Sequence, residues 1–208
     1  MNDFSHHAQL VDPANVVTFY SGGKAPFCGL SNFAACENGV EFKGKIYPTS
    51  EHAFQADLST TPNVFEASGT FCELTEEAFV KLGVKPADAP KKVKFWSGKK
   101  MVGILAKMKI NRQKKQGATK SVTKEEAISA FRTILKSKYT RNPHLRSILL
   151  ATKGKRLLEF VRSAERNYKK GVVERWGGMI VDGKIIGHNQ MGAIMESVRD
   201  ELLEENVC

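Results

Sequence analysis

The sequence has 208 residues, a mass of 23.1 kDa, 41% hydrophobic residues and 26% charged residues. A chain of this length and composition buries a sizeable core, so wholesale disorder is excluded. Its apolar runs are far shorter than the ~20 residues of a membrane helix, which excludes membrane-spanning helices. The polar N-terminus lacks a basic start followed by an apolar stretch, so we expect no secretory signal and a location in the cytoplasm or nucleus.

The net charge of +10 is concentrated in one segment. Residues 91–120 hold eleven of the 32 Lys and Arg residues and no Asp or Glu, and the rest of the chain is nearly neutral. A concentrated basic face attracts phosphate groups and polyanions. The same segment also fits a solvated helix surface with no ligand, so both interpretations stay open.

The four cysteines predict neither zinc nor disulfides, because none forms a C-x-x-C pair and no export signal precedes them. We expect Cys28, Cys36 and Cys72 to be reduced and mostly buried, and Cys208 to lie in a loose tail. No metal-binding motif, Walker loop, dinucleotide fingerprint or G-x-S-x-G elbow is present.

The first half of the chain predicts a strand at residues 16–20 and a hairpin at residues 40–47. Thr49 and Glu51 then mark a helix start, with a hydroxyl cap and an acid in the first turn. A short helix is predicted at residues 75–82, closed by Gly83. A longer helix is expected at residues 95–110, because apolar residues recur there at core-face spacing: Met101, Ile104, Leu105 and Met108.

The second half predicts a loop at residues 113–120, a capping box at residues 123–126 with its helix to residue 139, and a helix from Asn142 to near Thr152. A strand at residues 156–161, a hairpin at residues 179–186 and a last helix at residues 189–203 follow. We therefore expect an α+β fold, mainly helical, with a few short strands and hairpins. One domain would span residues 16–204, after a flexible leader at residues 1–15.

Five polar or glycine-containing patterns, taken in order, resemble the NADAR family, also called YbiA-like proteins. They are F-Y at residues 19–20 with S-N-F-A-A at 31–35; T-S-E-H-x-F-Q-A at 49–56; Trp96 with Lys100; L-L-x-T at 149–152 with Leu158 and Glu159; and W-G at 176–177 with G-x-N-x-x-G at 187–192, Met195 and Arg199. The resemblance covers roughly residues 17–203. It implies a single YbiA-like domain and an N-glycosidase that needs no metal or cofactor.

The catalytic residues that the resemblance implies are Glu51, Lys100 and Asp182. Breaking the bond between ribose C1 and a base nitrogen builds positive charge on the sugar, which a carboxylate such as Glu51 stabilises. The backbone N–H groups of a helix start would favour the charged form of Glu51, although the same residue also fits a simple helix stabiliser.

A lysine in the site would bind phosphate or attack the opened sugar as a Schiff-base nucleophile, with Lys100 and Lys107 as candidates. Leu58 stands where the family often has a lysine. Because the residues before Trp176 resemble an insertion, the second acidic role stays open among Glu165, Glu174 and Asp182.

The predicted substrate-binding residues come from the same patterns: Ser31, Asn32, Phe33, His52, Gln55, Trp96, Lys107, Trp176, Gly177 and Asn189. Asn32 or Asn189 would hold ribose hydroxyls, and Trp176 or Trp96 would stack on the base. Each also has a structural interpretation, with His52 hydrogen-bonded in the core, the tryptophans packed in it and Asn189 capping the last helix. Open space beside Gly177 and Gly178 favours Trp176 as the stacking residue.

The preferred hypothesis is removal of ADP-ribose from a modified guanine base in nucleic acid, because the basic segment is more than a small-molecule enzyme needs. One alternative is hydrolysis of phosphorylated ribosylamine intermediates of riboflavin biosynthesis. Another is a non-catalytic module that binds ADP-ribose or nucleic acid. We therefore expect ADP-ribosylated nucleic acid or a nucleotide-like small molecule as the partner, with no membrane and no obligate protein partner.

Overall fold

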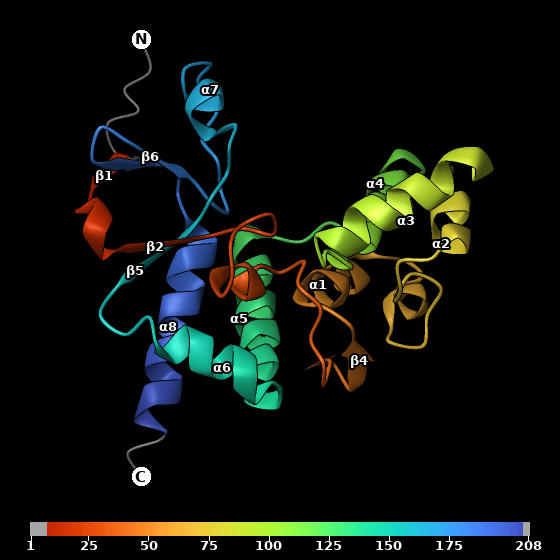
Figure 1. Cartoon of the computed structure of the whole chain (residues 1–208), viewed down its shortest axis with the longest axis horizontal. Coiled ribbons are helices and arrows are strands. Elements are labelled where there is room, and N and C mark those ends of the chain that lie inside the picture. The colour runs from red at the N-terminus through yellow and green to blue at the C-terminus, as the bar shows by residue number, and fades with distance from the viewer. Residues whose placement is uncertain (1–7, 206–208) are drawn as a thin grey trace. The chain divides into compact units, whose positions relative to one another are not determined.

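The computed structural model describes residues 8–205, and the chain divides into two compact units (Figure 1). The terminal unit joins the described parts of Met1–Ser31 and Ser147–Cys208, and the central unit is Asn32–Arg146. Both units combine helices with short strands, and helices predominate. The predicted α+β, mainly helical fold class is therefore confirmed.

The terminal unit contains the parallel pair β2 (Val16–Phe19) and β5 (Arg156–Glu159), which start in register with Val16 opposite Arg156. These strands are far apart in the sequence but run side by side (Figure 1). Both were predicted as strands and are confirmed. Leu157 and Leu158 of β5 are buried, which anchors the pair in the core of this unit.

A second sheet of the terminal unit has the strand order β1-β7-β6, with every pair antiparallel. The predicted hairpin is confirmed as β6 (Met179–Val181) and β7 (Lys184–Ile186). β1 (Ala8–Leu10) and the short helix η2 (Pro13–Asn15) fall within the predicted flexible leader, so that expectation is wrong for residues 8–15. These residues are ordered because β1 pairs with β7 in the antiparallel sheet. Residues 1–7 lie outside the described part.

The core of the terminal unit rests on α8 (Gln190–Glu204), which packs against β5. The predicted apolar face of this helix is confirmed, since its members are all buried: Met191, Ile194, Met195, Val198 and Leu202. Two short helices complete the unit, η3 (Phe27–Leu30) and α7 (Ala164–Tyr168). The helix α6 (Pro143–Leu150) begins at the predicted proline and ends two residues before Thr152.

The central unit is built around α1 (Ser50–Leu58), which packs against both α4 and α5 (Figure 1). The hairpin of β3 (Val40–Phe42) and β4 (Lys45–Tyr47) precedes it, as predicted. α5 (Lys124–Arg141) begins at the predicted capping box, in which the Thr123 hydroxyl and the Glu126 carboxylate each accept a backbone N–H. Stacked rings of Phe54 and Phe131, 4.0 Å between centroids, join α1 to α5.

The expected long helix at residues 95–110 is wrong, because two helices occupy this region. α3 (Ala89–Gly98) and α4 (Gly103–Lys115) are separated by a break at Lys100, which has a left-handed φ of 52°. The Lys100 N–H donates to the Ser97 carbonyl and the Met101 N–H to the Trp96 carbonyl, which is the Schellman pattern of a helix end. Glycine is the usual residue there, so a lysine hides this helix end in the sequence. α4 also extends through part of the expected loop.

A separate core lies among α2 (Glu76–Lys81), α3 and α4. The predicted helix at residues 75–82 is confirmed, with Thr75 as its cap. The buried members of this core are Phe71, Ala78, Phe79, Ala89 and Leu105, and the half-buried residues packed on them include Trp96, Ile104 and Met108. The short helices η4 (Pro62–Phe65) and η5 (Pro86–Asp88) connect these elements.

The cysteines are free thiols at positions 28, 36 and 72. Cys36 is buried and the other two are half-buried, so burial is less complete than expected. Burial raises the pKa of the Cys36 thiol. Cys208 lies outside the described residues.

Candidate active site

Glu51 lies at the second position of α1, directly after the cap that the sequence predicts. The Thr49 hydroxyl accepts the His52 N–H at 3.2 Å, and the Glu51 N–H donates to the Asn32 carbonyl at 3.0 Å. An acid at this position usually faces water, yet Glu51 is only 5% exposed. The backbone contact with Asn32 ties the start of α1 to the S-N-F segment.

The Glu51 side chain has partners on two helices. Its Oε1 accepts a hydrogen bond from Gln55 Nε2 at 2.8 Å, and Lys107 Nζ of α4 lies 3.8 Å from the same oxygen. The Gln55 amide must turn its nitrogen toward the carboxylate, and its Oε1 is then buried with no partner among the described residues. A buried acceptor without a donor is uncommon, and it suits a ligand hydroxyl or amine.

Burial raises the pKa of Glu51, because desolvation penalises the charged carboxylate. Lys107, the Gln55 hydrogen bond and Lys114 lower it, but they do not compensate for the burial. The expectation that the helix start favours the charged form is therefore outweighed by burial. A carboxyl group held in this way is suited to proton transfer or to stabilising charge on a substrate.

Gly103, the first residue of α4, allows this cluster to form. A Cβ at position 103 would lie 2.7 Å from the Cα of Phe33 and 3.2 Å from the Cβ of Glu51. The Gly103 N–H also donates to the Phe33 carbonyl at 3.2 Å. Only glycine therefore lets α4 approach both the S-N-F segment and Glu51. Gly103 is not among the residues predicted from the sequence, because its close packing is visible only in the fold.

His52 is buried and both of its ring nitrogens are used. Nε2 lies 2.8 Å from the Phe71 carbonyl, which only accepts, so Nε2 carries the proton. Nδ1 then accepts from the Thr49 hydroxyl at 2.8 Å. Burial lowers the pKa of His52 from 6.5 to about 4. These contacts fit the structural interpretation, in which His52 is hydrogen-bonded in the core.

His52 predicts a pH dependence of stability. The unfolded chain protonates this histidine near pH 6.5 and the folded chain only near pH 4, so the free energy of unfolding falls as the pH drops between these values. The expected loss is about 3 kcal/mol. Urea unfolding followed by tryptophan fluorescence measures it. The variant His52→Gln should lose this part of the pH dependence, and an unchanged slope would contradict the assignment.

The two candidate lysines are placed differently. Lys107 contacts Glu51, whereas no described contact joins Lys100 to Glu51. Lys100 is exposed and ends α3 in its left-handed conformation. Trp96 is half-buried, packs on the core of α2, α3 and α4, and meets the Phe95 ring edge-on. In the central unit the structure thus gathers Asn32, Phe33, Glu51, Gln55 and Lys107 into one cluster.

In the terminal unit, the end patterns of the sequence meet at the end of β5. The Gly178 N–H donates to the Glu159 carbonyl at 2.9 Å, and the Glu159 N–H donates to Asn189 Oδ1 at 3.1 Å. The Asn189 Nδ2 also donates to the Leu157 carbonyl at 2.7 Å. Asn189 precedes α8 as predicted, but its amide holds β5 instead of capping the helix.

Gly177 is packed tightly, so the expected open space beside Trp176 is wrong. A Cβ at position 177 would lie 2.3 Å from the Glu159 carbonyl oxygen. Trp176 itself is half-buried, and the Arg175 guanidinium lies 4.6 Å from the centre of its ring. Ser31 is buried at the end of η3, where its N–H donates to the Cys28 carbonyl.

The three acids considered for the second role lie at different places in the terminal unit. Asp182 is exposed in the turn between β6 and β7, with φ of 48°. Glu165 pairs with Lys169 at 2.5 Å, and Glu174 accepts from Asn167 Nδ2 at 2.6 Å. Glu159 is the acid that lies among Gly178 and Asn189. In the sequence, Glu159 is a residue of the L-L-x-T pattern with no predicted role.

The chain is similar to a known family of proteins over nearly its whole length. The family model of the NADAR domain matches residues 18–203 of the sequence. The chain belongs to the NADAR family. The structure is similar to the NMR structure of the E. coli protein YbiA, with a TM-score of 0.55, 22% sequence identity, and coverage of 96% of this chain and 91% of YbiA. No curated protein matches the sequence.

NADAR membership confirms the resemblance on which the site residues were chosen and supports an N-glycosidase role in general terms. The likeness to YbiA, at its low identity, adds the fold alone. Within residues 8–205, no helix is long and apolar enough to cross a membrane. In the same range, no three His, Cys, Asp or Glu side chains gather closely enough to hold a metal ion.

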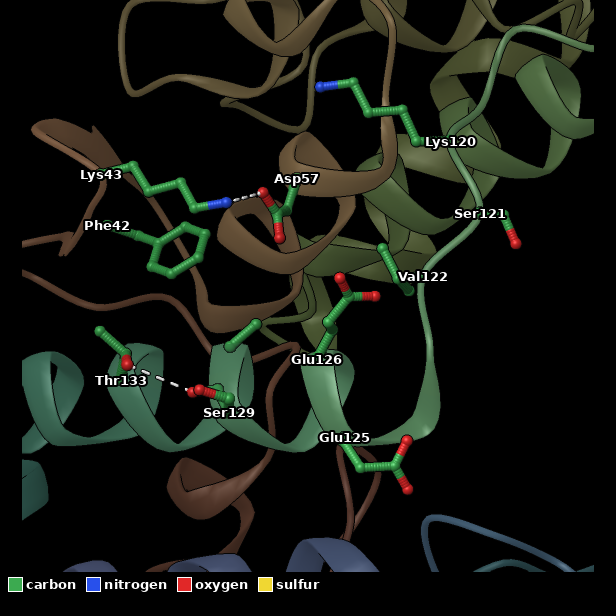
Figure 2. Close-up of a pocket in the computed structure, with 11 residues that line it drawn as sticks. Phe42, Lys43, Asp57, Lys120, Ser121, Val122, Glu125, Glu126, Ser129 and Thr133 are labelled. Atoms are coloured by element: carbon green, nitrogen blue, oxygen red, sulfur yellow. Dashed lines mark hydrogen bonds and ion pairs between the residues drawn. The ribbon is translucent and has the colours of Figure 1, made fainter.

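A cavity of about 760 Å³ in the central unit is not lined by any predicted site residue of this NADAR protein. It lies between the β3–β4 hairpin, the end of α1 and the first turns of α5 (Figure 2). Two of its carboxylates already have structural partners, since Asp57 pairs with Lys43 and Glu126 belongs to the α5 capping box. We therefore place the candidate chemistry at Glu51 and not in this cavity.

Proposed function

We propose that this NADAR protein is an N-glycoside hydrolase that removes ADP-ribose from a modified guanine base in nucleic acid. The observation that carries the proposal is the buried Glu51 carboxyl group, with its hydrogen bond to Gln55 and the Lys107 ammonium beside it. A buried carboxyl group with a raised pKa and a charged partner is typical of a reaction site.

In this proposal, Glu51 stabilises the positive charge that develops on ribose as the bond from C1 to the base nitrogen breaks. Burial strengthens that stabilisation, because little water screens the carboxylate. Gln55 Oε1, which has no hydrogen-bond partner among the described residues, accepts a hydrogen bond from a ribose hydroxyl. Lys107, with 46% of its side chain exposed, is accessible to a phosphate of the substrate while it faces Glu51.

The terminal unit carries two further candidates, each proposed from its own surroundings. Trp176 offers a half-buried aromatic ring suited to stacking on a base, with the Arg175 guanidinium 4.6 Å from its centre. Among the acids of the terminal unit, we favour Glu159 over Asp182 for a role in this unit, because it lies among the W-G and G-x-N patterns and Asp182 lies in an exposed turn.

The basic segment favours nucleic acid over a small metabolite as the substrate. α3 and α4 carry most of its eleven Lys and Arg residues, and no acid interrupts them. The alternative substrate, a phosphorylated ribosylamine of riboflavin biosynthesis, is favoured by Lys107 beside Glu51, which suits one phosphate. Leu58, where the family often has a lysine, favours the third candidate, a non-catalytic binding module.

Salt dependence separates these candidates. With a guanine-ADP-ribosylated oligonucleotide, kcat/KM should fall several-fold between ~50 mM and ~200 mM salt, because binding the strand releases counterions. A phosphorylated ribosylamine should be turned over poorly by comparison. Efficient turnover of the ribosylamine, with little salt dependence, would favour the metabolite enzyme. If neither substrate is turned over while the oligonucleotide is bound, the protein is a binding module.

Lys107 predicts a shift in the pH profile. Its ammonium lowers the pKa of Glu51, so Lys107→Gln should raise that pKa further. In this proposal the ionised carboxylate is the active form, so kcat/KM falls as the pH drops through the pKa of Glu51. This acid limb of the pH profile should move to higher pH in Lys107→Gln. Initial rates measured across the pH range test this.

Lys109 provides the matched control on the same helix, because it lies over the Phe71 ring and does not contribute to the pKa of Glu51. Lys109→Gln should leave the acid limb in place. Lys107→Arg keeps the charge but cannot form a Schiff base. Activity retained in Lys107→Arg supports the electrostatic role, and activity lost in it despite a normal fold supports the covalent route.

A further inference from the structure

The outer face of α3 carries a row of exposed residues that the proposed reaction does not use. Lys91 and Phe95 of α3 and Lys99, its C-cap, recur at four-residue spacing, so they follow one another along one side over about 12 Å. All three are exposed. The opposite face packs on the core through Ala89, Val93 and Trp96. The row is therefore fixed in direction by the packing of α3.

Phe95 is the unusual member of this row, because its side chain is 50% exposed. Its ring is held edge-on by Trp96, with 4.8 Å between ring centroids, and Lys99 Nζ lies 4.1 Å from its centre. An exposed aromatic ring on a rigid helix provides a flat apolar surface at little entropic cost.

The surroundings of Phe95 are strongly basic. Lys92 and Lys94 are also exposed on α3, and the segment 91–120, to which they belong, contains no Asp or Glu. A basic surface with an aromatic ring at its centre has the two features that bind single-stranded nucleic acid, namely charge for the phosphates and a ring for an unpaired base. Duplex nucleic acid lacks the unpaired base, and an acidic protein lacks a base to stack.

We propose that the outer face of α3 binds single-stranded nucleic acid, with an unpaired base stacked on Phe95 and backbone phosphates on Lys91 and Lys99. This inference rests on the proposed function for its link to catalysis, since it names a single strand as the preferred form of the substrate. The binding itself is independent of turnover.

Fluorescence anisotropy with a short, unmodified, labelled single strand tests the proposal. Phe95→Ala and Phe95→Leu should each weaken binding about tenfold, because both remove the stacking ring. Phe95→Tyr keeps the ring and should bind within about twofold of the native protein. Lys99→Gln should reduce the slope of log K against log salt by about 0.7, the value for one phosphate contact on a single strand.

Two variants serve as controls. Val80→Ala removes another exposed apolar side chain, 39% exposed, on α2 and should not change binding. Lys115→Gln removes a lysine near the end of α4, outside the row, and should change binding less than Lys99→Gln. Circular dichroism of each variant checks that the helices are intact.

Equal affinity of native protein and Phe95→Ala would overturn the proposal. Tighter binding of a duplex of the same sequence than of the single strand would also overturn it. So would competition by polyglutamate for the same surface, if the binding of polyglutamate depended on Phe95 as strongly as the binding of the strand. Because the strand carries no ADP-ribose, the result is separate from catalysis. If the protein hydrolyses the substrate but its binding of the strand does not depend on Phe95, the α3 surface is rejected and the proposed function stands. If binding depends on Phe95 but no substrate is hydrolysed, the α3 surface stands and the proposed function is rejected.

Discussion

Replacing Glu51 by Gln is expected to lower kcat for N-glycoside hydrolysis by about 10³-fold, because the substitution keeps the shape of the side chain and removes its charge and its proton. Substrate binding should change little. Steady-state kinetics with an ADP-ribosylated oligonucleotide, together with anisotropy measurements of binding, provides both quantities. A variant that keeps more than a tenth of the native kcat would contradict a catalytic role.

The same variant should be more stable than the native protein at neutral pH. Burial raises the folded-state pKa of Glu51, so the folded chain is penalised for holding the ionised form. Glu51→Gln removes this penalty, and we expect the free energy of unfolding to rise. The gain should shrink as the pH falls toward 4.5, the ordinary value, because both states then become protonated.

Glu77 offers a matched control, because it occupies the same position in its helix, two residues after the Thr75 cap of α2. Glu77 is exposed, and its hydrogen bond to Lys81 lowers its pKa. Glu77→Gln should therefore not stabilise the protein, and its activity should remain native. If Glu51 were only a helix stabiliser, the two variants would behave alike.

Replacing Gly103 by Ala is expected to displace the elements that surround Glu51 and so to lower both stability and activity. The new Cβ would lie 2.7 Å from the backbone of Phe33, so α4 or the S-N-F segment must move. We expect a loss of about 2 kcal/mol in the free energy of unfolding, as for overpacked cores. Activity should fall by about 10²-fold, because displacement of a catalytic group by about 1 Å has that effect.

Gly98, at the end of α3, is the control for this substitution, because a Cβ there would meet no atom within 4 Å. Gly98→Ala should raise stability by about 0.5 kcal/mol through helix propensity and leave hydrolysis unchanged. Thermal unfolding and initial rates of the two variants form the test. Equal behaviour of the two alanine variants would show that the close approach at Gly103 is unimportant.

The sequence predicts the parts of the fold that depend on local interactions. The Thr49 cap, the capping box before α5 and the two hairpins are specified by neighbouring residues, and each is found where expected. The break at Lys100 is not, because the apolar spacing continues through it and a lysine occupies the left-handed position. Helix periodicity alone joins α3 and α4 into one element.

The sequence offers candidate residues for the site but not their environment. The order of the NADAR patterns points to Glu51, but nothing adjacent to Glu51 distinguishes it from the exposed Glu77. Its burial arises from the approach of α4, which depends on Gly103, a residue about fifty positions away. For the same reason the pairing with Lys107 instead of Lys100 follows only from the packing of α1 on α4.

Mass spectrometry of the products from a guanine-ADP-ribosylated oligonucleotide tests the central claim most directly. Native protein should release free ADP-ribose and leave an intact strand with an unmodified guanine, and Glu51→Gln should leave the starting material unchanged. Persistence of the modification with native protein, or its removal at the native rate by Glu51→Gln, would contradict the claim that a buried carboxyl group at Glu51 drives cleavage of the N-glycosidic bond.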